Sequence, residues 1–217
     1  MVRTLLVRGM LVGIVAGMLS YGFLKIYGEP QVDRAISFET QMDEAKATAD
    51  KAHGMATGMN MSDEEGPALV SRTVQAGLGL FTAIIVYSAA FGGLFGLAFA
   101  FASVRFPGAL TPQSLSALLA ATGFVAIYLV PNLKYPASPP AVGDPETIGV
   151  RTALYFIMIA AGLVLPTVNE VPDQFPAAVL WKFRIASLGA QVIMWTTLGL
   201  LFGALTQRAL TMGRTRA

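Results

Sequence analysis

Long apolar stretches are the feature of this sequence that most restricts its fold. A helix that crosses a lipid bilayer needs about 20 mostly apolar residues. Five stretches approach or pass that length, at residues 5–26, 73–104, 114–133, 152–168 and 177–206. Charged residues make up only 13% of the chain, against about 25% in a soluble domain. We therefore predict an all-α, polytopic transmembrane helix bundle with about five apolar spans, forming one transmembrane domain over residues 1–217.

Glycines recur at four-residue spacing within three of the predicted spans. The three sets are Gly9, Gly13 and Gly17, then Gly92 and Gly96, then Gly199 and Gly203. Small residues at this spacing let two membrane helices approach closely. We therefore expect these faces to form helix–helix contacts. Trp195 and Gln191 lie in the middle of the last span and are expected to face other helices rather than lipid.

A long polar segment, residues 28–71, separates the first two spans and is predicted to be an external loop. Its part from 34 to 52 contains good helix formers and is predicted to be an amphipathic surface helix. Its part from 53 to 67 contains several glycines and a proline and is predicted to be irregular.

The charges are distributed unevenly along the chain. All 13 acidic residues fall within three segments, 29–65, 144–146 and 170–173. The other polar ends carry only basic residues, which are Arg3, Arg8, Arg105, Arg208, Arg214 and Arg216. An excess of Lys and Arg marks the cytoplasmic side of a membrane protein. We therefore predict that the N-terminus, the 105–113 turn and the C-terminus are cytoplasmic. The basic residues lie at span ends rather than in one patch, so nucleic-acid binding is not expected.

The stretch 152–168 conflicts with this layout. The loops before and after it both carry acids and are predicted to be external, yet 17 residues cannot cross a bilayer twice. Three explanations remain open. The stretch is re-entrant or buried among other helices, or the charge argument fails for the last span, or the chain lacks a segment here.

The segment after the surface helix contains the strongest metal-ligating pattern in the chain. The candidate ligands are His53, Met55, Met59, Met61 and Asp63. An imidazole nitrogen suits divalent cobalt or nickel and carboxylates can complete the coordination, whereas thioethers favour softer ions such as Cu(I). The alternative is a solvated loop that happens to contain methionines.

A second group of polar residues is predicted to gather at the external ends of the helices. Its members are Glu29, Asn132, Asp144, Asn169 and Glu170. Carboxylates and amides at a membrane mouth can attract and partly dehydrate a divalent cation. The alternative is that they cap helices and hold the proline-rich loops. Arg184 is predicted to be a structural clamp that pairs with Glu170 or Asp144.

Catalytic chemistry is not expected from this sequence. The chain has one histidine and no cysteine, which excludes a histidine-based triad that uses a thiol and a multi-histidine zinc centre. It also has no phosphate-binding loop of the Walker type, so no ATPase activity of its own is expected.

Three groups of polar and aromatic strings resemble the CbtA family, whose members are probable cobalt transporter membrane subunits. The first group is YLVPNLKYPA at 128–137 with PPAVGDPETIG at 139–149. The second is LPTVNEVP at 165–172, FP at 175–176 and LWKFRIASLG at 180–189. The third is RTLLVRGM at 3–10 with GEPQVDRA at 28–35.

The resemblance implies a multi-pass subunit of a cobalt uptake system in the bacterial cytoplasmic membrane, of the channel or carrier type. Cobalt is then a transient ion rather than a permanent cofactor. The implied partners, besides the lipid bilayer, are a small histidine-rich membrane subunit or a larger membrane complex. A non-transporting accessory or scaffold subunit, and transport of nickel or copper, are the alternatives.

The chain departs from the family pattern in two places. Members are longer between the positions of Ala160 and Leu163, where they complete one helix and begin another. This is the region in which the charge argument fails, so a missing segment is expected there. The first external loop is often rich in histidine in the family, whereas His53 stands alone here.

Overall fold

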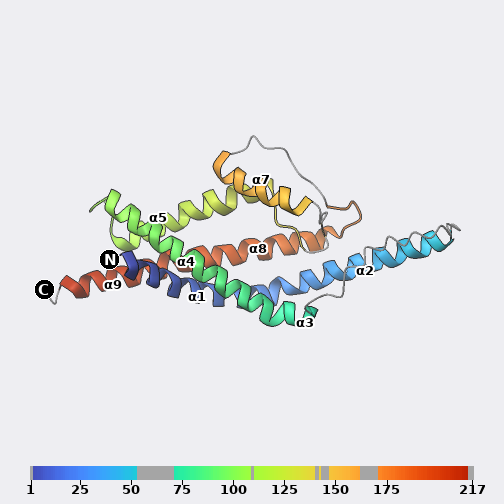
Figure 1. Ribbon diagram of the computed structural model, residues 1–217, viewed down its shortest axis with the longest axis horizontal. Helices are drawn as coiled ribbons and strands as arrows, with labels where there is room; N and C mark the ends of the chain where they lie inside the picture. The colour runs from blue at the N-terminus through green and yellow to red at the C-terminus, as the bar shows by residue number, and fades with distance from the viewer. Residues whose placement is uncertain are drawn as a thin grey trace.

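The computed structural model of the protein describes residues 2–52, 71–108, 110–139, 142, 147–161 and 171–214. These residues contain no strand, and their helices run mostly along the longest axis of the molecule (Figure 1). The α-helices are α1 (Val2–Tyr27), α2 (Glu29–Ala52), α3 (Arg72–Val74), α4 (Leu80–Arg105), α5 (Pro112–Gly123), α6 (Val130–Lys134), α7 (Ile148–Ala161), α8 (Ala177–Thr197) and α9 (Gly203–Arg214). Three π-helical segments join consecutive helices and are η1 (Gln75–Gly79), η2 (Phe124–Leu129) and η5 (Leu198–Phe202).

Within the described residues, four continuous helical segments are long and apolar enough to cross a membrane. They are Val2–Tyr27, Arg72–Arg105, Pro112–Lys134 and Ala177–Met212. These segments coincide with four of the five stretches predicted from hydropathy. The all-α, polytopic membrane fold is therefore confirmed. The surface helix predicted over residues 34–52 is also present, as the larger part of α2.

The fifth apolar stretch is represented by α7, which begins four residues before the predicted range. It has 14 residues. A helix of that length rises about 21 Å, which is less than the roughly 30 Å of a hydrocarbon core. The described part of this stretch is therefore shorter than a crossing helix. It lies beside α6 and η2, where the Tyr155 hydroxyl donates to the Ile127 carbonyl at 3.4 Å.

Helix α1 packs against α4 along an interface of small residues. A Cβ atom placed on Gly9 or Gly13 would overlap the backbone of Gly92 or Ser88 on α4. On the other side of the bundle, a Cβ atom on Gly203 would lie only 2.9 Å from the Cβ atom of Ser116 on α5. These contacts confirm the close approach predicted from glycine spacing, because each glycine leaves room for the neighbouring backbone.

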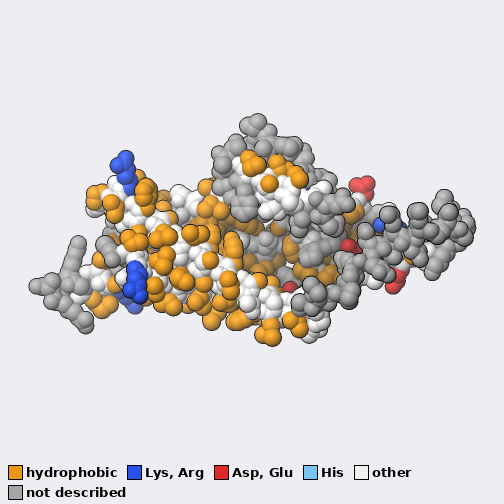
Figure 2. Space-filling view, viewed as in Figure 1, with side chains coloured by type: hydrophobic (Ala, Val, Ile, Leu, Met, Phe, Trp, Pro, Cys, Tyr) orange, Lys and Arg blue, Asp and Glu red, His pale blue; other side chains and the backbone are white. Residues whose placement is uncertain are grey.

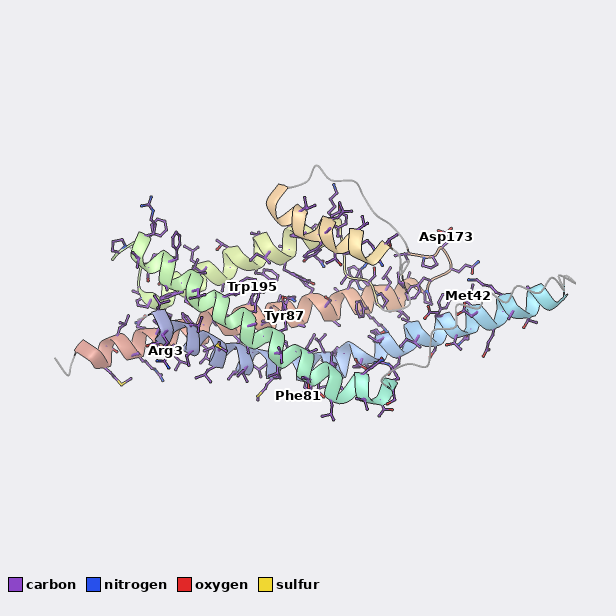
Figure 3. All side chains as sticks on the ribbon, in the orientation of Figure 1. Arg3, Met42, Phe81, Tyr87, Asp173 and Trp195 are labelled. Carbon is purple, nitrogen blue, oxygen red and sulfur yellow. The ribbon has the colours of Figure 1, made fainter. Side chains whose placement is uncertain are left out.

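The core of the bundle lies among α1, α4, α5, α8 and η5 and is rich in aromatic side chains. Phe202 is fully buried and meets Phe95 edge-on, with ring centroids 5.5 Å apart. Trp195 is also buried, and its ring lies 4.9 Å from that of Phe91. Figure 3 places Trp195 near the middle of the bundle. It therefore faces other helices, as predicted.

The two ends of the bundle differ in charge. Both termini and the α4–α5 turn lie at one end (Figure 1), where Lys and Arg side chains gather in Figure 2. We call this the basic end and define it by Arg3, Arg8, Arg105 and Arg208. The opposite, acidic end carries Glu29, Asp33 and Asp173, and Figure 3 shows Arg3 and Asp173 far apart along the long axis. The surface between the ends is mainly apolar, which identifies a multi-pass membrane protein.

Candidate functional site

The acidic end is organised around an ion pair that joins two distant parts of the chain. Glu29 is the first residue of α2, and Asp33 lies one turn later on the same face. Nη2 of Arg72, at the start of α3, donates to Oε2 of Glu29 at 2.8 Å and to Oδ1 of Asp33 at 2.9 Å. The Glu29 side chain is only 11% exposed, whereas that of Asp33 is 62% exposed. Arg72 thus bridges a nearly buried and a solvated carboxylate.

A cavity of about 390 Å³ lies beside this ion pair. Its walls come from α1, α2, α8 and the segment that runs from Arg72 to Leu80. The polar lining residues are Glu29, Arg72, Gln75, Ser187 and Gln191. The rest of the wall is apolar, and includes Leu24 and Phe183. Gln191 therefore faces the interior, as predicted, and contributes to a small polar surface within the apolar bundle.

A hydrogen-bonded chain leads from this cavity to the opposite side of α8. The Ser187 hydroxyl, which lines the cavity, lies 3.1 Å from the Tyr128 hydroxyl. The amide Nδ2 of Asn132 donates to the same Tyr128 oxygen at 3.4 Å. Because that bond uses the oxygen as an acceptor, the Tyr128 O–H is available to donate to Ser187. Asn132 is thereby connected to the cavity through two hydroxyl groups.

The cavity wall is fastened by a second basic residue. Nζ of Lys25, near the end of α1, donates to the Ala76 carbonyl of η1 at 2.8 Å. This hydrogen bond connects α1 to η1. Lys25 and Arg72 together attach the start of the second membrane span to α1 and α2.

The predicted external cluster lies only partly within the described residues. Glu29 lines the cavity directly, and Asn132 reaches it through Tyr128 and Ser187. Asp144, Asn169 and Glu170 lie outside the described residues. The predicted metal ligands His53, Met55, Met59, Met61 and Asp63 also lie outside them. In the part of the chain that is described, no group of three or more His, Asp or Glu side chains is placed to hold a metal ion.

Arg184 connects α8 to the extended segment that follows α6. Its Nε donates to the Ala137 carbonyl at 3.2 Å. The acidic partners predicted for it, Glu170 and Asp144, lie outside the described residues. The observed acceptor is a backbone carbonyl oxygen, which a pairing of opposite charges along the sequence does not predict.

Arg72 was not singled out from the sequence, although a signal for it exists. It is the only Lys or Arg between residues 52 and 104, and it directly precedes an apolar span. The nearest acidic residues along the chain are the nine in segment 29–65, so one of them is the expected partner of Arg72. The sequence does not indicate which of these nine acids it contacts.

Burial raises the pKa of Tyr155 on α7 to about 12, and the neighbouring phenols of Tyr128 and Tyr87 add to this effect. The Tyr155 phenol therefore stays protonated at neutral pH. It remains a donor to the Ile127 carbonyl on η2.

Comparison with known proteins gives one match. A family model described as "Probable cobalt transporter subunit (CbtA)" matches the chain over residues 2–165 and 160–207. The two matched segments overlap at residues 160–165, which is where the sequence predicts a missing segment. No curated protein and no solved structure matches the chain.

Proposed function

Because this chain belongs to the CbtA family of probable cobalt transporter subunits, we propose that it is the membrane subunit of a cobalt uptake system and receives the ion through the cavity beside Glu29. The proposal places the protein in the bacterial cytoplasmic membrane with both termini in the cytoplasm. The cavity is the observation that supports this assignment of the ion path.

The lining of the cavity suits a hydrated divalent cation. Co²⁺ accepts oxygen and nitrogen ligands. Glu29 supplies a negative charge, and the amides of Gln75 and Gln191 with the Ser187 hydroxyl supply neutral oxygens. Charged and dipolar groups of this kind attract a cation and replace part of its water shell at a membrane mouth. The mostly apolar remainder of the wall strengthens the attraction, because it lowers the local dielectric.

Arg72 supplies the positive charge that Glu29 needs when no cation is bound. A nearly buried carboxylate without a partner is strongly unfavourable. Asp33 is well exposed and already contacts the same guanidinium nitrogen. An arriving cation that binds Glu29 therefore releases Arg72 onto Asp33 and leaves no carboxylate unpaired. In this proposal Arg72 competes with the ion for the Glu29 carboxylate. A divalent ion displaces Arg72 from Glu29 more readily than a monovalent ion does.

Four crossings support the proposed orientation. An even number of membrane-crossing helices returns the chain to its starting side, so the termini lie together, as they do at the basic end. Lys and Arg mark the cytoplasmic side, which leaves the cavity and the long polar segment outside. With no Walker loop in the sequence, the subunit works as a channel or carrier, or beside a partner subunit that supplies the energy.

Accumulation of radioactive cobalt by cells in cobalt-limited medium tests the proposal. Cells that lack the protein are complemented with the wild type, with Glu29→Gln or with the control Glu44→Gln, an exposed site on α2 away from the cavity. We expect Glu29→Gln to lower uptake about tenfold, the effect of losing about 1.4 kcal/mol of cation binding. Glu44→Gln should match the wild type. Unchanged uptake in the deletion strain, or full uptake by Glu29→Gln at equal protein levels, overturns the proposal.

One observation favours a different role. Arg72 already pairs with both Glu29 and Asp33, which is also what a purely structural fastening requires. An accessory or scaffold subunit would copurify with a larger membrane complex and leave cobalt uptake unchanged when Glu29 is replaced. The same cells assayed with labelled nickel and with copper test the two alternative substrates.

A further inference from the structure

The basic end of the bundle has a groove between the first and last helices. It has a volume of about 570 Å³ and is lined by Arg3, Thr4, Val7, Arg8, Leu11 and Leu205. Five of these residues lie on one face of α1, and Leu205 belongs to α9. Val7, Leu11 and Leu205 are exposed, so the groove has an apolar floor that leads away from the arginines toward the middle of the bundle.

Both arginines lie on the outer part of this face of α1, and an apolar residue lies deepest. Arg3 lies at the end of the bundle, Val7 and Arg8 about one turn deeper, and Leu11 two turns deeper. Eight residues of α-helix rise about 12 Å, which is the scale from a lipid phosphate to the upper part of its acyl chains. The groove therefore presents a cationic end at the membrane surface and an apolar floor within the membrane.

One of the two arginines is held in place by the protein. Nη1 of Arg8 donates to Oγ1 of Thr206 on α9 at 3.0 Å, and the Thr206 side chain is buried. That bond uses one of the five N–H donors of the guanidinium group. Arg8 is thus fixed across the groove between α1 and α9, with donors that remain for an anion.

No Asp or Glu side chain lies among the described residues of the basic end. The chain contains no Asp or Glu in residues 1–28, 66–143 or 174–217. Arg3 and Arg8 therefore have no acidic side chain near them in the described part of the chain. An anion from outside the protein can therefore serve as their counter-charge.

We propose that this groove binds one anionic phospholipid, with the phosphate on Arg3 and Arg8 and an acyl chain along Val7, Leu11 and Leu205. The charge complementarity favours a headgroup with net negative charge, because a zwitterionic headgroup carries a cation that competes with the arginines. A soluble phosphate would use the arginines and leave the apolar floor unused. The inference does not depend on the proposed transport function, since it concerns the opposite end of the bundle from Glu29.

Native mass spectrometry of the full-length protein in detergent micelles tests this site. The protein is titrated with phosphatidylglycerol, with phosphatidylcholine of the same acyl chains, or with glycerol phosphate, which has the anionic headgroup alone. We expect one phosphatidylglycerol to bind at least about tenfold more tightly than phosphatidylcholine, because each basic residue near an anionic lipid contributes about fivefold. Glycerol phosphate should not compete at the same concentration.

Variants locate the site. Arg3→Gln combined with Arg8→Gln should remove the preference for phosphatidylglycerol, and Leu11→Asn should weaken binding of both lipids. Thr206→Val keeps both arginines but removes the hydrogen bond that positions Arg8. It should lower the preference for phosphatidylglycerol over phosphatidylcholine about fivefold, which is the contribution of one aligned arginine. Arg34→Gln is the matched control, because this exposed arginine lies at the acidic end and donates to Gln31.

Three results would overturn the proposal. They are equal affinity of the wild type for the two lipids, an unchanged phosphatidylglycerol affinity in the double arginine variant, and competition by glycerol phosphate at equal concentration. The first and third comparisons use only the wild-type protein, so they decide the matter even if a variant does not fold.

Discussion

Arg72 donates to Glu29 across 2.8 Å, and this bond joins residues that stand 43 positions apart in the chain. Glu29 is the first residue of α2, and Arg72 is the first residue of the second membrane span. The bond therefore holds together the two ends of the long polar segment between the first two spans. It also forms one wall of the cavity, so the same contact contributes to the stability of the acidic end and to the charge that an approaching ion meets.

Replacing Arg72 and replacing Glu29 should lower the stability of the protein by different amounts. Arg72→Gln leaves the nearly buried Glu29 carboxylate unpaired, and we expect it to lower the free energy of unfolding by about 2 kcal/mol. Glu29→Gln leaves Arg72 with Asp33 and should cost only about 1 kcal/mol. The double variant should lose less free energy of unfolding than the sum of the losses in the two single variants. Unfolding in mixed detergent micelles, followed by circular dichroism, measures all three.

An exposed pair on the same helix is the control for this cycle. Nζ of Lys46 lies 3.9 Å from Oδ1 of Asp43, and both side chains are well exposed. Replacing Lys46 by Gln should change stability by less than about 0.5 kcal/mol. Equal costs for Arg72→Gln and Glu29→Gln would show that the burial of Glu29 does not govern this contact.

Close packing of α1 on α4 should make Gly13 intolerant of even one methyl group. A Cβ atom there would meet the backbone carbonyl of Ser88, which cannot move without shifting α4. We expect Gly13→Ala to destabilise the protein by about 2 kcal/mol, a typical effect of overpacking. Gly22→Ala on the same helix meets nothing within 4 Å and should be neutral or slightly stabilising. Equal melting temperatures for the two variants would contradict the interface.

The contact of Arg184 with the Ala137 carbonyl should restrain the segment after α6. Replacing Arg184 by Gln removes a charge-assisted hydrogen bond across 47 positions of the chain. We expect faster tryptic cleavage after Lys134, because the released segment reaches extended conformations more often. Lys182→Gln, two residues away and exposed, is the control and should leave the cleavage rate unchanged. If Arg184→Gln and Lys182→Gln are cleaved at the same rate, Arg184 does not act as a clamp on this segment.

Hydropathy located the four long spans within a few residues because a bilayer imposes a minimum length on any crossing helix. Glycine spacing likewise identified the α1–α4 interface, since Gly9 and Gly13 share one face whatever the partner helix is. The Arg72–Glu29 pair lacked such a signal. Nine acids precede Arg72 in the polar segment, and only the turn at Gly28, which sets where α2 begins, decides which of them it meets. Pairing across a long connection depends on tertiary geometry that residue spacing does not carry.

The conflict in the charge layout around α7 can be settled by measurement. If α7 does not cross, the segments before and after it lie on one side, and four crossings leave both termini on the other. The chain has no cysteine, so single cysteines can be labelled without removing native thiols. Ser138→Cys and Asp173→Cys flank α7, and Leu110→Cys lies in the turn at the basic end.

In intact cells, a membrane-impermeant maleimide should label both Ser138→Cys and Asp173→Cys, because both belong to the acidic end. Leu110→Cys should react only after the membrane is permeabilised. Labelling of Ser138→Cys and Asp173→Cys from opposite sides would mean that the chain crosses between them, which would require the residues that follow α7 to complete a span. Labelling of Leu110→Cys in intact cells, with Ser138→Cys and Asp173→Cys reacting only after permeabilisation, would invert the positive-inside assignment while leaving the helix arrangement intact. The comparison of Ser138 with Asp173 therefore tests the role of α7 separately from the orientation of the bundle.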